Sequence, residues 1–169
     1  MRKLSSFSSR RSLYLLNLKI RDATNRGLYK QTLDLYSSIL QSGVGGGSNL
    51  TYPMVLKACS SSLDAIHIGT MLHSHVTHLG FQEDVYVQTS LLDMYSNCGD
   101  LVSSRKVFDE MSERGIVSWN SMIALFHCSL VDESFSLVNQ MRALVMDPSS
   151  TIFLVLFPAC SSLLLGLST

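Results

Sequence analysis

Short sequence motifs recur along this chain, and this recurrence constrains the fold more than any other feature. The run Ala-Cys-Ser-Ser at residues 58–61 returns at residues 159–162. An apolar pair with another large apolar residue four positions after its first member begins at Leu35, Val107 and Leu137. Self-similarity at periods of roughly 20–50 residues is typical of solenoids, in which stacked units share one continuous core. The recurrence therefore predicts an extended array that acts through a repeated surface rather than through a single cleft.

The apolar residues fall at helical spacing, and no segment shows the alternation typical of a strand. Between residues 63 and 79 they recur every three to five positions, which predicts a helix with one buried stripe that ends at Gly80. Further helices are expected at 29–41 and at 101–111, the latter capped by the carboxylate of Asp100. Gly69 lies inside a predicted helix, where glycine costs ~1 kcal/mol relative to alanine. We therefore expect an all-α fold in which a neighbouring helix approaches Gly69 closely.

Glycines, prolines and polar turns divide the chain into units. We place repeat one at 13–48, repeat two at 49–84, repeat three at 85–115, repeat four at 116–149 and a truncated repeat five at 150–169. We expect about four and a half repeats, with an uncovered apolar face at the C-terminal end that promotes self-association.

The segment 151–167 is almost wholly apolar and about as long as the shortest membrane spans, ~17 residues. A tail anchor is therefore an alternative reading of this segment. Pro158 interrupts it, however, and half of a repeat explains its composition better, so we do not expect a membrane partner.

The N-terminus has the composition of a targeting signal. Residues 1–21 are rich in arginine, lysine and serine and contain no Asp or Glu, which is typical of organelle transit peptides. We therefore predict an organelle transit segment at residues 1–12. The early arginines favour the mitochondrion, with the chloroplast as the alternative.

Charge and cysteine content exclude several classes of function. The 13 basic and 13 acidic residues leave no broad basic field, so RNA binding would require contacts to bases plus a few placed Lys and Arg. The four cysteines form no Cys-x-x-Cys pair, which predicts small core residues rather than a zinc site or a disulfide framework. The chain also lacks a His-x-Glu motif and a nucleophile–base pair. We therefore expect no enzyme activity, no metal, no cofactor and no small-molecule substrate.

Four runs of residues match a known family. Residues 52–59 read Tyr-Pro-Met-Val-Leu-Lys-Ala-Cys, residues 92–100 read Leu-Asp-Met-Tyr-Ser-Asn-Cys-Gly-Asp, residues 107–111 read Val-Phe-Asp-Glu-Met and residues 118–123 read Ser-Trp-Asn-Ser-Met-Ile. With units two, three and four long, short and standard in length, the chain resembles the plant pentatricopeptide repeat proteins whose repeats alternate in this way, apparently in a truncated form. The resemblance implies a right-handed superhelical solenoid of helix-turn-helix repeats.

The resemblance further implies sequence-specific binding of single-stranded organelle RNA, with one nucleotide per repeat. In each repeat, one residue near the start of the first helix and one at the repeat end would read a base, and a neighbouring apolar side chain would stack on it. Carried over by position, the pairs are Asn17 with Ser48, Pro53 with Asp84, Thr89 with Gly115, and Asn120 with Ser149.

These pairs differ in what they imply. The pairs of Asn17 and Asn120 resemble pairs that prefer pyrimidines, cytidine first. Thr89 resembles a purine selector, although Gly115 has no side chain with which to read a base. Pro53 offers no donor, as in the long repeats of the family, which contribute little to readout.

Each candidate also has a structural reading. Asn120 could cap a helix or bridge turns, and the other polar candidates are ordinary turn or helix-start residues. Trp119 and Tyr95 are more typical of a core than of a stacking platform. His73 resembles a structural position of the family, and His75 and His78 are expected to be exposed.

The expected function is that of a recognition adaptor in RNA modification (C-to-U editing) or processing, with editing or processing proteins as further partners. The alternatives are a helical-repeat scaffold that binds proteins instead of RNA, and an inactive truncated remnant. Because the array reads about four bases at most, and stacking contributes ~1–3 kcal/mol per base, we expect affinity no tighter than micromolar.

Overall fold

The computed structural model describes residues 2–41, 47–61, 66–127 and 131–144, together with residues 146, 148, 150 and 152. These residues form helices and turns, with no strand among them, which confirms the predicted all-α class. The helices are α1 (Arg2–Asn25), α2 (Tyr29–Gln41), α3 (Thr51–Cys59), α4 (Ile66–His78), α5 (Val85–Asn97), α6 (Leu101–Glu110), α7 (Ile116–His127) and α8 (Val131–Ala143).

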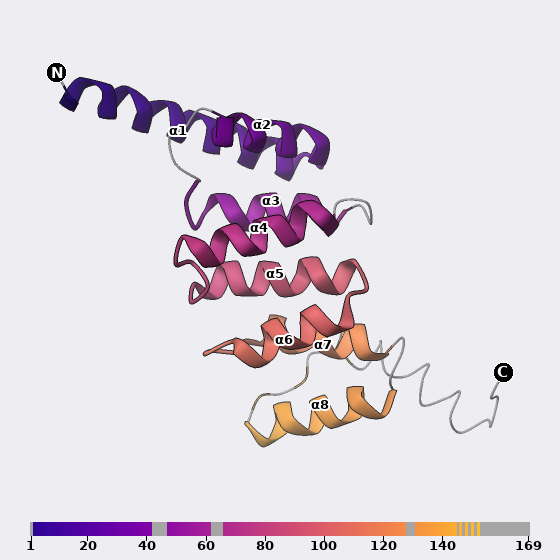
Figure 1. Ribbon diagram of the computed structural model, residues 1–169. Coiled ribbons are helices and arrows are strands. Elements are labelled where there is room, and N and C mark those ends of the chain that lie inside the picture. The colour runs from indigo at the N-terminus through magenta and orange to yellow at the C-terminus, as the bar shows by residue number, and fades with distance from the viewer. Residues whose placement is uncertain are drawn as a thin grey trace.

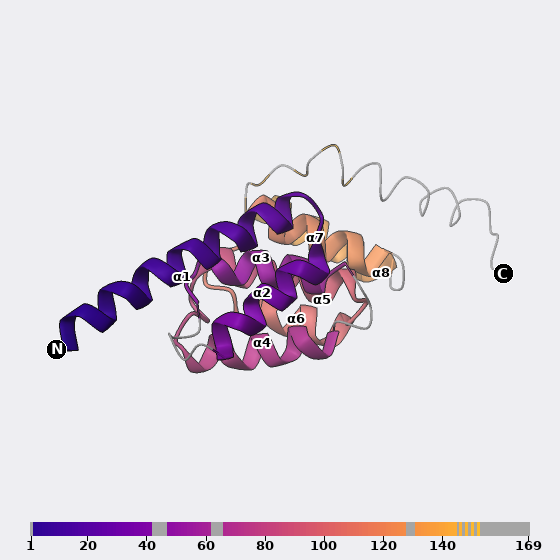
Figure 2. The same ribbon diagram turned by 90° about the horizontal axis from the view of Figure 1, so that it is seen from above.

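The helices follow one another as antiparallel pairs that stack along a single axis (Figure 1). The first helices of the pairs, α1, α3, α5 and α7, pack on one another in sequence and form an inner layer. Seen along the stack, α1, α3 and α7 lie to one side and α2 and α4 to the other (Figure 2). This arrangement confirms the predicted solenoid of helical pairs and places equivalent positions of successive inner helices side by side.

Left-handed glycines follow α4 and α5, and one of them is Gly80, where the sequence predicts a helix end. Gly80 follows α4 with φ of 79° and Gly99 follows α5 with φ of 74°. In both turns the next residue donates a backbone hydrogen bond across six residues, from Phe81 to Val76 and from Asp100 to Tyr95, each at 3.0 Å. These bonds satisfy carbonyls that a helix end leaves free. Asp100 then caps α6 by accepting from the Ser103 N–H at 3.0 Å, as predicted.

The largest buried side chains confirm the predicted core. Trp119 is 2% exposed and meets the edge of the Phe108 ring, with the ring centroids 4.8 Å apart. Tyr95 is also buried. A Cβ built on Gly69 would lie 2.5 Å from Sδ of Met94 on α5, so the predicted close approach of a neighbouring helix is confirmed.

Two histidines of α4 hydrogen-bond to tyrosines of neighbouring helices. His73 Nδ1 lies 3.0 Å from the hydroxyl of Tyr95 on α5, and His75 Nδ1 lies 3.1 Å from the hydroxyl of Tyr36 on α2. His78 is exposed, as expected. The expectation that His75 is an exposed variant is wrong, because the buried Tyr36 ring needs a polar partner for its hydroxyl.

The predicted unit boundaries remain predictions. Helix α1 begins at Arg2 and therefore contains both the proposed transit segment and the first helix of repeat one. Most of repeat five lies outside the described residues, as does Ser149. Within the described part of the chain, no helix combines the length and the apolar character needed to cross a membrane.

Candidate nucleic-acid interface

The predicted reading residues lie one on each of the four inner helices. Asn17 lies on α1, Pro53 on α3, Thr89 on α5 and Asn120 on α7. Successive inner helices pack side by side, so these residues form a row across the stack. We call this face of the four helices the inner groove.

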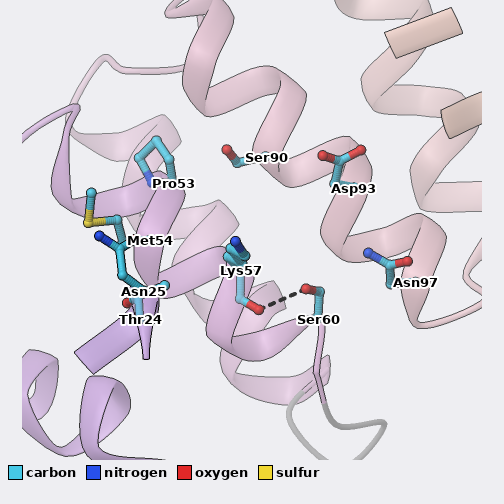
Figure 3. Close-up of a pocket in the computed structure, with 9 residues that line it drawn as sticks. All are labelled: Thr24, Asn25, Pro53, Met54, Lys57, Ser60, Ser90, Asp93 and Asn97. Atoms are coloured by element: carbon cyan, nitrogen blue, oxygen red, sulfur yellow. Dashed lines mark hydrogen bonds between the residues drawn. The ribbon is translucent and has the colours of Figure 1, made fainter. Parts of the chain in front are cut away.

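Three adjoining cavities make up the described part of the inner groove. The first, of about 310 Å³, is lined by Asn17 and Ser48 and also by Leu50 and Met54. The second, of about 510 Å³, is lined by Leu50, Met54, Pro53, Thr89 and Gly115. The third, of about 450 Å³, shares Pro53 and Met54 with the second (Figure 3). Five of the eight predicted residues thus line adjoining cavities of the inner groove, namely Asn17, Ser48, Pro53, Thr89 and Gly115.

Asn17 and Ser48 are joined through Thr51, at the start of α3. The Thr51 hydroxyl donates to Asn17 Oδ1 at 2.9 Å and accepts from the Ser48 backbone N–H at 3.0 Å. The Ser48 hydroxyl lies 3.2 Å from the same Thr51 oxygen. Because the carbonyl oxygen of the Asn17 amide accepts from Thr51, its NH₂ group supplies the donors that Asn17 can offer to a ligand.

Asp84 is a helix cap and does not line a groove cavity together with Pro53. Its Oδ1 accepts from the backbone N–H groups of Tyr86 and Val87 at 3.0 and 3.1 Å, which caps α5. Its Oδ2 accepts from the side-chain amide of Asn49 at 3.1 Å. Asn49 itself lines the 510 Å³ cavity. Asp84 therefore contacts the groove indirectly, through its hydrogen bond to the Asn49 side chain.

Thr89 and Gly115 face the same cavity, but the Thr89 hydroxyl proton is already used. It donates to the Val85 carbonyl at 2.8 Å, which leaves the oxygen as an acceptor. Asn120 is half-buried on α7, next to the buried Trp119. Its predicted partner Ser149 lies outside the described residues, so the structure does not place the fourth pair.

A second row of groove residues is apolar and exposed, and the sequence analysis did not name it. The four side chains are 58–78% exposed, and each lies three positions before a reading residue; they are Tyr14, Leu50, Tyr86 and Val117. Each lines one of the first two cavities. Residues three apart share one face of a helix, so α1, α5 and α7 each present an apolar side chain beside the reading position, and Leu50 does so from the N-cap of α3. Large apolar residues outside the buried stripe, at this fixed spacing, are the signal that would have identified them.

The third cavity holds the polar end of the groove (Figure 3). Lys57 approaches it from α3 and Ser60 from the C-cap of that helix, while Ser90, Asp93 and Asn97 approach it from α5. Ser121 of α7 donates its hydroxyl proton to Oδ1 of Asp93. Burial raises the pKa of Asp93, and the bond from Ser121 partly opposes that shift.

The inner groove offers surfaces for stacking and for hydrogen bonding. The described residues contain no group of three His, Cys, Asp or Glu side chains that could hold a metal ion. Burial, with a smaller contribution from Cys98, raises the pKa of the Cys59 thiol to about 12, so this buried cysteine stays protonated. Alternating apolar and hydrogen-bonding side chains suit planar heterocycles, which need a stacking surface and an edge partner.

Comparison with known proteins agrees with this architecture. The family model for the PPR repeat matches residues 89–116 and 117–144. A pentatricopeptide repeat-containing protein of Arabidopsis thaliana is 41% identical over 145 residues, which cover 85% of this chain and 22% of that protein. A relative from the same plant named as chloroplastic is 33% identical over 156 residues (92% of this chain, 18% of the relative). Another relative, named as mitochondrial, is 33% identical over 161 residues, which cover 95% of this chain and 24% of that relative.

The chain spans about a fifth of the length of these curated relatives. The stacked helical pairs, the repeated groove positions and the matches over most of its residues lead to one assignment. The chain belongs to the pentatricopeptide repeat family.

Proposed function

We propose that the inner groove binds single-stranded RNA in a sequence-dependent manner, with one base at each repeat. The observation that carries this proposal is the exposed apolar row, which lies three positions before the reading row on α1, α5 and α7 and at the residue that precedes α3. A base can stack on the apolar side chain while its edge meets the polar one. Stacking of this kind tolerates any base, whereas the edge contact discriminates among bases.

The Asn17 site is proposed to prefer cytidine and, after it, uridine. Thr51 occupies Oδ1 of Asn17, so the site offers N–H donors to a base. Cytosine presents two acceptors, N3 and O2, on its Watson–Crick edge. Guanine presents N–H donors at N1 and N2 there, which would face the donors of Asn17. Asn120 is proposed to act in the same way in repeat four, with Ser149 as its partner.

The remaining predicted pairs are proposed to contribute less. Thr89 offers an acceptor oxygen to a purine amino group, without help from Gly115. Pro53 supplies contact area but no donor, and Asp84 acts by holding Asn49. The recognition is therefore expected to be concentrated in repeats one and four.

The cellular role proposed for the chain is that of a recognition adaptor in organelle RNA editing or processing. The names of two relatives point to the chloroplast for one and to the mitochondrion for the other. The arginine-rich N-terminus favours the mitochondrion for this chain. Editing or processing proteins would then supply the chemistry at the bound RNA.

Titration of the 169-residue chain with short fluorescent RNAs tests the proposal. We expect micromolar binding to a cytidine-rich octamer and weaker binding to a guanosine-rich one. Tyr86→Ala should weaken binding about 5- to 150-fold, equivalent to the ~1–3 kcal/mol of one stacked base. Met71→Ala is the matched control, because Met71 is 72% exposed on α4 while Tyr86 is 78% exposed on α5.

Equal weakening by the two substitutions would contradict the groove as the binding surface. A folded protein that binds neither RNA would refute the proposal and favour the protein-interaction scaffold or the inactive remnant.

A further inference from the structure

A third row of residues lies one helical turn beyond the reading row. Four positions after each reading residue stand Arg21, Lys57, Asp93 and Ala124. Residues four apart share one face of a helix, so this row runs parallel to the reading row. Its charge changes along the stack: it is positive on α1 and α3, negative on α5 and neutral on α7.

The charged members of this row face the inner groove. Arg21 lines the same cavity as Asn17 and Ser48. Lys57 and Asp93 line the third cavity from opposite sides, α3 and α5 (Figure 3). Arg21 and Lys57 are exposed, and neither belongs to the two ion pairs found in the described part of the chain, which join Arg26 to Asp22 and Arg105 to Asp109. Both cations are therefore available to an anionic ligand.

Asp93 is held in place by a residue of the next repeat. The hydroxyl of Ser121 on α7 donates to its Oδ1, which fixes the carboxylate at the floor of the third cavity. A fixed carboxylate attracts hydrogen-bond donors and repels phosphate groups. An RNA strand that follows the reading row would thus meet favourable charges at repeats one and two and an unfavourable charge at repeat three.

We propose that this third row binds the RNA backbone unequally: Arg21 and Lys57 hold phosphates beside repeats one and two, and Asp93 turns the backbone away at repeat three. The inference rests on the proposed RNA binding and specifies how the backbone lies in the groove. It also accounts for how a chain without net charge could bind a polyanion, since two placed cations suffice for local contacts.

The salt dependence of binding tests this inference. For single-stranded nucleic acid, log K falls against log salt with a slope of about −0.7 for each phosphate neutralised. With the cytidine-rich octamer, Arg21→Gln and Lys57→Gln should each make the slope less negative by about 0.7. Lys30→Gln and Lys106→Gln are matched controls, because these exposed lysines lie on α2 and α6, and the slope should not change.

Asp93→Asn tests the repulsive position. The substitution keeps an oxygen that accepts from Ser121 and removes the negative charge. The affinity for RNA should therefore rise at low salt, and this gain should vanish at high salt, where charges are screened. Circular dichroism melts would show that each variant is folded.

The outcomes separate this inference from the proposed function. If wild-type protein prefers the cytidine-rich RNA but Arg21→Gln and Lys57→Gln keep the wild-type slope, the backbone assignment is wrong and the proposed function stands. Unchanged or reduced affinity in Asp93→Asn at low salt would refute the repulsive role. If the folded wild-type chain binds neither RNA, both proposals fail.

Discussion

The hydroxyl of Thr51 donates a hydrogen bond to Oδ1 of Asn17 across the interface between α1 and α3. The other contacts of Thr51 agree with this direction. A backbone N–H can only donate, so the Ser48 N–H uses one lone pair of the Thr51 oxygen, and the proton of Thr51 is free for Asn17. A residue with no proposed contact to a base thereby sets the orientation of the amide that reads it.

Thr51→Val should therefore reduce both stability and selectivity. Thr51 is buried, and valine leaves the Ser48 N–H without its acceptor, which we expect to lower the free energy of unfolding by about 1–3 kcal/mol. The preference for cytidine over guanosine should fall as well, because the Asn17 amide can then rotate. Urea unfolding and RNA titration measure the two effects, and Thr51→Ser should restore both. If Thr51→Val keeps the preference for cytidine, the hydrogen bond from Thr51 is not what makes Asn17 select a base.

Asp84 and Asp100 form a matched pair of helix caps. Each accepts backbone hydrogen bonds at the start of its helix, Asp84 at α5 and Asp100 at α6. Substitution of either by alanine should cost about 0.5–2 kcal/mol of unfolding free energy. Only Asp84→Ala should also alter RNA affinity, because Asp84 holds Asn49 at the groove. The same affinity change in both variants would argue against a local role for Asp84.

Asp93→Asn should raise thermal stability at neutral pH. Burial raises the pKa of Asp93 above its ordinary value of 3.8, so the folded state binds this proton more tightly than the unfolded chain does. Its favourable contribution is fully present below pH 3.8 and is lost as the pH rises through the raised pKa. Asparagine avoids the burial of a charge and still accepts from Ser121.

Melting curves of wild type and Asp93→Asn between pH 3 and pH 7 check this prediction. The advantage of the variant should be greatest at pH 7, should shrink as the pH falls through the raised pKa of Asp93 and should no longer change below pH 3.8. A lower melting temperature for the variant at pH 7 would mean that the charged form of Asp93 stabilises the fold.

The contact between Gly69 and Met94 should limit the size of residue 69. In Gly69→Ala, a gain of ~1 kcal/mol in helix propensity offsets the displacement of the Met94 side chain, so stability should change little. Gly69→Val adds an isopropyl group, two methyl groups more than alanine, against the fully buried Met94, and we expect a loss of about 2–3 kcal/mol.

Chemical unfolding of both variants provides the measurement for residue 69. Gly115→Ala is the control, since a Cβ there meets no atom within 4 Å. A valine variant as stable as wild type would show that the Met94 side chain moves aside at little cost.

Features that depend on neighbours along the chain were predictable from the sequence. The ends of α4 and α5 and the cap of α6 are local, because the residues that make each turn lie within one helical turn of each other. The burial of Trp119 and Tyr95 followed from their size within apolar segments.

Contacts between distant segments were not predictable in the same way. His75 meets Tyr36 and Thr51 meets Asn17 only because α2 packs near α4 and α1 packs against α3. The contact of Asp93 with Ser121 likewise requires knowledge of which helix faces which. The sequence therefore predicted the candidate residues of the groove, while the structure supplies the partners that orient them.

In the described part of the chain, α1 contacts α3, α3 contacts α5 and α5 contacts α7, so the interfaces between successive inner helices connect the pairs along the stack. A force applied to the two ends would act on these interfaces in series. The chain should then behave as a soft spring that lengthens by small rotations at each interface, and at higher load it should give way one helical pair at a time.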